Sequence, residues 1–141
     1  MDTPSLAALQ AIIRRGVPLA EAWGIELLAA SAGTATLRLP AQPSLLRPGD
    51  TVSGPALMGL ADVAMWAALL SVTAGKDESV TSSMTVNFLR PAGNGAVLAE
   101  ARIVKRGRRM VFGEIQLRSE ASDEVAVHVT TSWAVIAPAA R

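Results

Sequence analysis

The residue with the most evident chemistry in this sequence is a single carboxylate inside a long apolar segment. Residues 54–75 read GPALMGLADVAMWAALLSVTAG, and Asp62 is the only charged residue between Asp50 and Lys76. An ionised carboxylate removed from water is costly unless it is paired or hydrogen-bonded. Helical spacing offers Asp62 no basic partner on its own segment. Either Asp62 bonds a neighbouring backbone group or hydroxyl, or it is a functional carboxylate, and we favour the second hypothesis.

The start of the same segment offers a second functional group. Pro55 suits the first position of a helix, where its missing N–H has no cost. The first N–H groups of a helix lack partners, and the helix dipole attracts negative charge there. The N–H of Gly54 would then be free to polarise a carbonyl and to hold an oxyanion. The alternative, that Gly54 only permits a tight turn, stays open.

The spacing of these two residues has a structural consequence. Gly54 and Asp62 are eight residues apart, which separates their backbones by roughly 12 Å along a helix. Groups that serve one carbonyl must lie within about 3–4 Å of the reacting atoms. An Asp side chain does not span that difference. If both residues act on one substrate, Gly54 comes from one subunit and Asp62 from another, and the protein is an obligatory dimer.

Basic residues cluster at a predicted hairpin tip. Residues 105–109 read KRGRR, with Arg106, Gly107 and Arg108 at the centre. Lys and Arg bind phosphates well, although a solvated turn is an equal alternative. Nucleic-acid binding is a poor third hypothesis, because the net charge is near zero and no aromatic stacking platform accompanies the cluster.

His128 lies on the face of its strand opposite to Val127 and Val129. It has no Ser or Asp partner at motif spacing, so we expect it to be structural or exposed.

The elements that must position these groups follow from periodicity. Thr3 or Ser5 caps a helix to about Arg15, and two strands lie within residues 23–39. Residues 40–50, with three prolines, are expected to be loop. The apolar segment is a buried helix. Four strands with alternating residues follow, and their short connections predict an antiparallel meander. In the first of these four strands, residues 80–88, the pattern places Ser83 on the same face as Thr81. Together the elements predict an α+β fold in which five to six strands curl around one central helix.

Composition limits the other classes of function. A chain of 141 residues fits one domain, with residues 1–20 as a helical extension. Net charge is +1, so no global field attracts nucleic acid or anionic membrane. The absence of Cys and the single His argue against disulfides and a metal site. Half of the residues are apolar and 18% are charged, which suggests that a partner subunit covers some apolar surface.

The N-terminus and the apolar helix bear on location. Asp2 and Gln10 do not fit an export signal, so a cytoplasmic protein is expected. Residues 54–74 approach the length of a membrane span, and one central Asp costs only about 2.5–3.5 kcal/mol on insertion scales. The strands downstream nevertheless need this helix as their core, so we expect no membrane insertion.

Three segments together resemble a known family. SGPALMGLADVAMWAALLS, SVTSSMTVNFLRPAG and ARIVKRGRRMVFGEIQLRS are similar to the PaaI-type (phenylacetic acid degradation) branch of the hotdog-fold thioesterases, over residues 45–136. The resemblance implies hydrolysis of a small or aromatic acyl-CoA to free acid and CoA, with CoA as part of the substrate and no further cofactor. It also implies homodimers, which often pair into tetramers.

The resemblance assigns roles to individual residues. It implies that Gly54 donates to the oxyanion, that Asp62 is general base or nucleophile, and that Thr81 positions the water. Ser83 would replace Thr81 if the register were shifted. Arg106, Gly107 and Arg108 would lie near the CoA phosphates. Trp66, Met58 and Met65 would line the acyl pocket or, as we favour, pack in the core.

Two positions depart from the family pattern. Ser53 and Pro55 flank Gly54 where many relatives have His and Gly, so Ser53 changes the hydrogen bonding beside the substrate. Arg47 stands where an Asn is common, and it contacts the thioester, pairs with Asp62 or faces solvent. The alternative function is therefore a non-catalytic module that binds or senses acyl-CoA on the same fold. A hydratase is less favoured, because such enzymes use an Asp/His pair.

Overall fold

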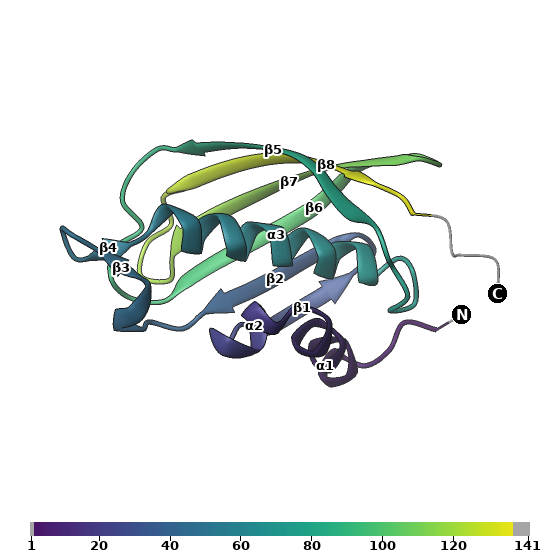
Figure 1. Ribbon diagram of the computed structural model, residues 1–141, viewed down its shortest axis with the longest axis horizontal. Helices are drawn as coiled ribbons and strands as arrows, with labels where there is room; N and C mark the ends of the chain where they lie inside the picture. Colours follow the sequence, from purple (N-terminus) through teal and green to yellow (C-terminus); the bar gives the residue numbers. More distant parts are fainter. Residues whose placement is uncertain (1, 137–141) are drawn as a thin grey trace.

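The computed structural model describes residues 2–136 and shows one antiparallel sheet curled around one long helix (Figure 1). The six strands follow the spatial order β1-β2-β6-β7-β8-β5, and the helix α3 (Gly54–Leu70) crosses their concave face. The bounds are Glu26–Ser31 (β1), Thr34–Leu39 (β2), Val80–Phe88 (β5), Val97–Arg106 (β6), Met110–Ser119 (β7) and Val127–Ala134 (β8). The expected α+β hotdog architecture is confirmed.

Helix α3 is buried on every side except one stripe. Leu60, Ala64 and Leu70 have no exposed surface, because the curled sheet surrounds them. The helix begins at Gly54 and not, as expected, at Pro55. The side chain of Ser53 accepts a hydrogen bond from the Ala56 N–H and so caps the helix. The residues of α3 that are not fully buried are Gly54, Pro55, Met58, Gly59, Asp62 and Trp66. They recur at spacings of three and four, which places them on one face.

The prediction of a four-strand meander is wrong for β5. Strands β6, β7 and β8 are consecutive antiparallel neighbours, but β5 pairs with β8 at the far edge. The connection between β5 and β6 is long enough to pass around the end of the sheet, where the Val52 N–H donates to the Gly93 carbonyl. Strand β6 is then free to pair with β2, and the sheet closes around the helix.

A β-bulge in β5 changes which residues face the helix. Thr81 pairs with Trp133, whereas Ser83 pairs with Ser132, so Ser82 is an additional residue on this strand. Trp133 is buried against the helix and its neighbour Ser132 points the other way. Ser83 therefore lies on the face opposite to Thr81. The expectation that the two residues share a face is wrong, because strict alternation does not anticipate a bulge.

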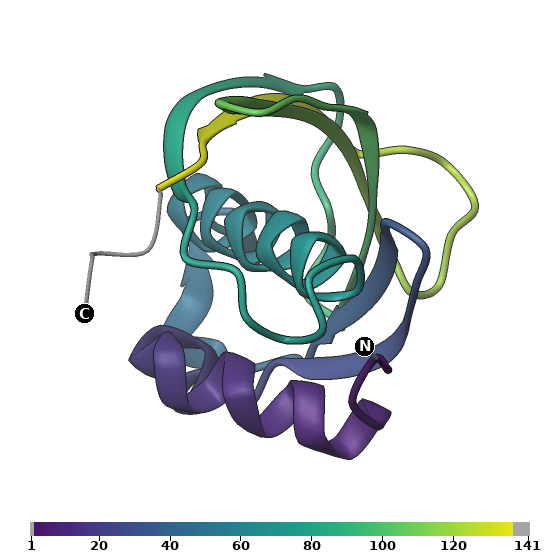
Figure 2. The same ribbon diagram turned by 90° about the vertical axis from the view of Figure 1, so that its right-hand side faces the viewer.

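The N-terminal helices pack beside α3 and cover some of the stripe that the sheet leaves open, at Trp66 and Gly59 (Figure 2). Helix α1 (Leu6–Gly16) is capped by Ser5, and α2 (Pro18–Ala22) follows directly, so the helical extension continues slightly beyond the expected residue 20. The side chain of Gln10 accepts from the Leu27 N–H, which joins α1 to β1. Residues 2–136 share one hydrophobic core.

Residues 40–50 are not entirely loop as expected. They contain a 3-10 turn, Pro43–Leu45, and a short strand β3 (Leu46–Arg47) that pairs with β4 (Thr51–Val52) ahead of the helix.

None of the helices within the described residues has the length and apolar character needed to cross a membrane.

Candidate active site

The carboxylate of Asp62 lies on the open stripe of α3, beside the edge strand β5. The Thr81 hydroxyl donates a 2.6 Å hydrogen bond to Asp62 Oδ1. Burial raises the pKa of Asp62 above its ordinary value, and the Thr81 hydrogen bond partly opposes that rise. Within residues 2–136 Asp62 forms no ion pair, so Arg47 of the same chain does not pair with it. A partly buried carboxylate without a cation fits a proton acceptor or nucleophile.

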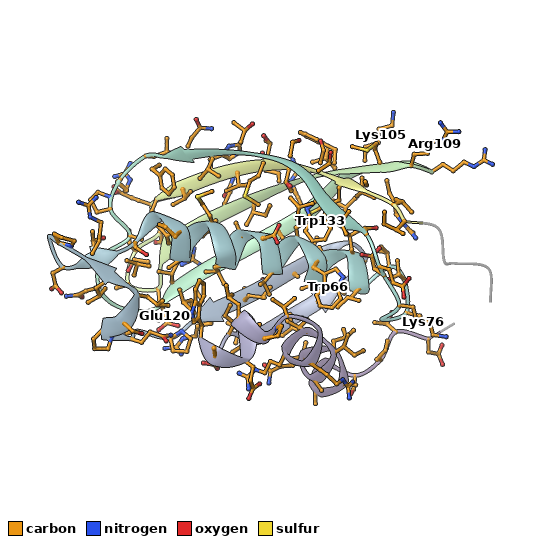
Figure 3. All side chains as sticks on the ribbon, viewed as in Figure 1. Trp66, Lys76, Lys105, Arg109, Glu120 and Trp133 are labelled. Atoms are coloured by element: carbon orange, nitrogen blue, oxygen red, sulfur yellow. The ribbon has the colours of Figure 1, made fainter. Side chains whose placement is uncertain are left out.

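A small cavity adjoins this carboxylate and is called here the Asp62 cavity. Its volume is about 310 Å³, and its lining residues are Val17, Asp62, Val63, Trp66, Ser79, Val80, Thr81 and Trp133. Figure 3 labels the two indoles, Trp66 and Trp133, near the C-terminal half of α3. The Nε1 atom of Trp133 is buried and has no hydrogen-bond acceptor among the described residues. The walls are mostly apolar, and the polar groups lie around the carboxylate.

The N–H of Gly54 is available for a ligand, as its position in the sequence predicts. Gly54 is the first residue of α3, and its N–H has no hydrogen-bond acceptor within residues 2–136. It lines a separate cleft of about 540 Å³, called here the Gly54 cleft, with Arg47, Phe88 and Leu89. Arg47 is exposed there, and its Nε donates to the Pro48 carbonyl.

The flanking residues Ser53 and Pro55 have other positions. The Ser53 hydroxyl is engaged as the helix cap, and its N–H donates to the Leu45 carbonyl at 2.8 Å. Pro55 is exposed at the second helical position. Neither residue lines the Gly54 cleft or the Asp62 cavity. Their predicted substrate contacts remain predictions.

The basic hairpin lines a third and larger space, called here the hairpin cavity, of about 940 Å³. Arg106, Gly107 and Arg108 contribute to it from the β6–β7 turn, and Lys76 contributes from the segment after α3. Trp66 borders both this cavity and the Asp62 cavity. Figure 3 shows Lys105 and Arg109 at the tip of the same hairpin. Positive charge therefore lies next to the aromatic wall of the carboxylate site.

One subunit does not assemble all of the predicted catalytic groups. Asp62 and Thr81 are in contact, and Gly54 and Arg47 share a cleft, but these two pairs lie at different positions along α3. Ser83 faces away from the helix, so it does not take the place of Thr81. Trp66 borders the site, Met65 is fully buried in the core, and Met58 is 41% exposed. The preference for core packing is thus correct for Met65, holds in part for Trp66, which packs against the edge of the core, and is wrong for Met58.

The sequence did not single out Trp133 or Val17 as residues of the site. The strand pattern of Trp133 indicates burial but not which cavity it borders. The position of Val17 depends on how α1 packs against α3, for which periodicity contains no signal.

A titratable cluster that contains the single His lies on the opposite face of the sheet. His128 Nε2 is 2.8 Å from Glu114 Oε2, and Arg102 Nε donates to the other oxygen of Glu114. His128 is therefore structural, as its sequence context predicts. No group of His, Cys, Asp or Glu among residues 2–136 is arranged to hold a metal ion.

Comparison with known proteins identifies the family. The model of the thioesterase superfamily matches residues 49–126, a span that includes Gly54, Asp62, Thr81 and the basic hairpin. The chain belongs to the thioesterase superfamily. Its activity is accordingly thioester hydrolysis. The expected membership is confirmed.

Solved structures of other proteins resemble this thioesterase over most of its length. A candidate thioesterase from Silicibacter sp. TM1040 is 32% identical, with a TM-score of 0.83, 92% of this chain covered and 90% of that chain. A variant of the phenylacetic acid degradation protein PaaI from Thermus thermophilus is 26% identical, with a TM-score of 0.73, 85% of this chain covered and 100% of that chain. A candidate esterase of Saccharolobus solfataricus is 22% identical over 136 residues, which are 96% of this chain and 95% of the relative.

Proposed function

We propose that this thioesterase hydrolyses small or aromatic acyl-CoA thioesters, with Asp62 as general base or nucleophile. The observation that carries the proposal is the environment of Asp62. Its partly buried carboxylate has one hydroxyl donor, no cation among residues 2–136, and a largely apolar cavity beside it. The resemblance of the chain to a PaaI protein of phenylacetic acid degradation supports an acyl-CoA substrate with an aromatic or small acyl group.

Two chemical routes use the same groups. In the first, Asp62 removes a proton from water, and the water oxygen attacks the thioester carbonyl. The tetrahedral oxyanion collapses, the C–S bond breaks, and the CoA thiolate receives the proton from Asp62. In the second, Asp62 attacks the carbonyl, the thiolate leaves, and water hydrolyses the resulting anhydride. In both routes the Gly54 N–H stabilises the oxyanion and Thr81 orients the carboxylate or the water.

The proposed site needs two subunits. Gly54 is about 12 Å from Asp62 along one helix, so a second copy with antiparallel α3 must bring its own Gly54 to the Asp62 of the first. The open face of the molecule supports this arrangement. Phe88 and Leu89 are 52% and 58% exposed near Gly54. Strand β5 is the last strand of the sheet, so its outer edge has no partner strand among residues 2–136. A homodimer would cover these groups, and pairs of dimers would form the tetramer implied by the resemblance.

The basic hairpin supplies a complement for the CoA phosphates. Arg106 and Arg108 line the large hairpin cavity, which meets the Asp62 cavity at Trp66. A thioester carbonyl held at Asp62 would leave its nucleotide portion within reach of these guanidinium groups. CoA is part of the substrate, and the proposed chemistry employs no additional cofactor.

The test separates the carboxylate from the backbone donor. Asp62→Asn should lower kcat/KM for acyl-CoA by about a hundredfold or more, the usual scale for loss of a general base. Gly54→Pro removes the N–H at a position where proline is accepted, and Ser53, with ψ 153°, already has the conformation required before proline. Because a ring at residue 54 also precedes Pro55, where the α conformation is disfavoured, circular dichroism must first show that this variant keeps the native fold. Its kcat/KM should fall by about 10²–10³.

The matched control is Gly54→Ala, which retains the N–H. Apart from its chain neighbours Ser53 and Pro55, a Cβ at this position would meet only Phe88, at an ordinary 3.5 Å. Like proline it adds a side chain ahead of Pro55, so it controls for that crowding. This variant should keep activity within about threefold of the unmodified protein. Thiol release from acetyl-, butyryl-, benzoyl- and phenylacetyl-CoA is the measurement. Binding of these esters without any turnover by the unmodified protein would overturn the proposal and favour the non-catalytic module.

A further inference from the structure

We propose that Trp66, held in position by Gly16, limits the size of the acyl group accepted beside Asp62, so that the end of α1 helps to set substrate specificity. This inference rests on the proposed function. It assigns the Asp62 cavity to the acyl group and gives Trp66 the role of its end wall.

The assignment of the cavity follows from its chemistry. A thioester has an acyl group on one side of its carbonyl and the phosphate-bearing CoA on the other. The hairpin cavity and the Asp62 cavity share Trp66 in their linings. Like the two sides of the thioester, one carries many charged groups and the other is mostly apolar. The hairpin cavity has the three basic residues Arg106, Arg108 and Lys76 in its lining, together with the acidic Asp77 and Glu78 and several apolar side chains. The Asp62 cavity has three valines and two indoles, and Asp62 is its one charged residue. Phosphates match the first lining and an apolar acyl group matches the second.

Trp66 stands where these two spaces meet. It is one helical turn beyond Asp62 and borders both cavities, so its indole forms the partition between them. The opposite wall of the Asp62 cavity is Trp133, which the β-sheet fixes in position opposite Thr81. A straight acyl chain that extends past the volume between these two indoles would collide with Trp66.

The indole of Trp66 has little freedom to move aside. Its Nε1 donates a 3.3 Å hydrogen bond to the Asp77 carbonyl. Its six-membered ring lies directly against Gly16, where an added Cβ would be only 2.7 Å from Trp66 Cη2. Only a hydrogen atom fits at that position. The next residue, Val17, is itself part of the cavity wall. The end of α1 therefore fixes the partition and contributes to the pocket.

A limit of this kind defines a class of substrate. The cavity of about 310 Å³ accepts short, branched or aromatic acyl groups and excludes long straight chains. Removal of the indole would enlarge the Asp62 cavity by the volume of the Trp66 ring and so lengthen the space available to the acyl chain.

The experiment compares acyl chain lengths in Trp66→Ala and Trp66→Phe. For each variant, kcat/KM is measured by thiol release with butyryl-, hexanoyl-, decanoyl- and phenylacetyl-CoA. Trp66→Ala should raise the ratio of decanoyl-CoA to butyryl-CoA at least tenfold, and Trp66→Phe should raise it less. If all four substrates change by the same factor, Trp66 is only structural and the inference is wrong.

Gly16→Ala tests the positioning role, and Gly59→Ala is its matched control. A Cβ at Gly59 would meet Trp23 at 2.8 Å, so it disturbs the same packing of the N-terminal helices on α3 but through an indole that does not line the Asp62 cavity. Gly16→Ala should change the decanoyl-to-butyryl ratio at least threefold, and Gly59→Ala should leave it unchanged. Once Trp66 is alanine, Gly16→Ala should have no further effect on the ratio. An equal change in both glycine variants, or a full effect without the indole, would contradict the proposal.

Affinities distinguish this inference from the proposed function. Dissociation constants for the same four esters are measured by calorimetry with Asp62→Asn and with Asp62→Asn combined with Trp66→Ala, which removes turnover from the comparison. A tenfold gain in relative affinity for decanoyl-CoA supports the size limit even if the unmodified protein hydrolyses none of the esters. Unchanged relative affinities together with normal hydrolysis would refute the proposed size limit and leave the proposed thioesterase function intact.

Discussion

The proton affinity of Asp62 is set by two opposing effects. Burial penalises the ionised carboxylate and raises its pKa, whereas the hydroxyl of Thr81 donates to it and lowers the pKa. A base with a pKa above that of an ordinary aspartate accepts a proton from water more readily, provided that it stays ionised at the working pH. Thr81 therefore adjusts both the strength of the base and the pH range in which it acts.

Replacement of Thr81 tests this balance. Thr81→Val removes the donor and should raise the pKa of Asp62 further, so the acid limb of the kcat/KM–pH profile should move to higher pH. Activity at the optimum should fall by about tenfold, the scale of a lost hydrogen bond to a charged group. Thr81→Ser retains the hydroxyl and should keep the limb in place. An acid limb at the same pH in all three proteins would contradict the role of Thr81.

The same environment predicts that Asp62 lowers stability at neutral pH. Because its pKa is raised on folding, the folded protein binds the Asp62 proton more tightly than the unfolded chain does. The free energy of unfolding therefore falls as pH rises from the unfolded pKa through the folded pKa. Asp62→Asn should be more stable than the unmodified protein at pH 7–8, and this advantage should shrink as the pH falls below both values.

Urea denaturation across this pH range is the measurement. Loss of stability in Asp62→Asn at neutral pH would show that the carboxylate makes favourable contacts that outweigh its desolvation. The protein should be kept at constant concentration, since dissociation of the proposed dimer would change the apparent stability.

The helix and the sheet that hold Asp62 pack tightly against each other at Gly113. Met65 has no exposed surface, and a Cβ built on Gly113 of β7 would overlap its sulfur. Gly113→Ala should therefore lower the free energy of unfolding by about 1–3 kcal/mol through overpacking. Gly95→Ala makes the same chemical change where no atom lies within 4 Å, and should stay within about 0.5 kcal/mol. Equal midpoints of urea unfolding for the two variants would exclude close packing at Gly113.

The sequence predicts the elements better than their connections. The apolar helix around Asp62 and the alternating strands were recognisable, because burial of one face or side makes apolar residues recur with the spacing of the element. The pairing of β5 with β8 was not, because it depends on the curl of the whole sheet and not on any local signal. The bulge at Ser82 was equally hidden, and it alone decides that Thr81, and not Ser83, reaches the carboxylate. Gly54 and Asp62 were identified by type and spacing, but the indoles around them become visible only when distant elements pack together.

At the scale of the whole molecule, the decisive question is whether one site takes residues from two chains. A mixed dimer of Asp62→Asn and Gly54→Pro subunits answers it. Each homodimer should be nearly inactive, but the mixed dimer contains one site with Gly54 from the first subunit and Asp62 from the second. Differently tagged, co-purified mixed dimers should therefore regain activity at one of their two sites. If each site used residues from a single chain, every site would carry one defect and no activity would return.

The pairing of β5 with the last strand, β8, also determines when the proposed site forms during synthesis on the ribosome. Thr81 is synthesised long before Trp133, yet the strand that carries it pairs, within residues 2–136, with β8 alone. Until residue 134 has left the exit tunnel, β8 is not available to hold β5 in place. The helix that carries Asp62 can form, but the Thr81 hydroxyl is not yet fixed beside the carboxylate. Because such pairing between distant segments is slow, the nascent chain holds its carboxylate without the Thr81 hydrogen bond, and its half of the proposed two-subunit site is complete only after the last strand is added.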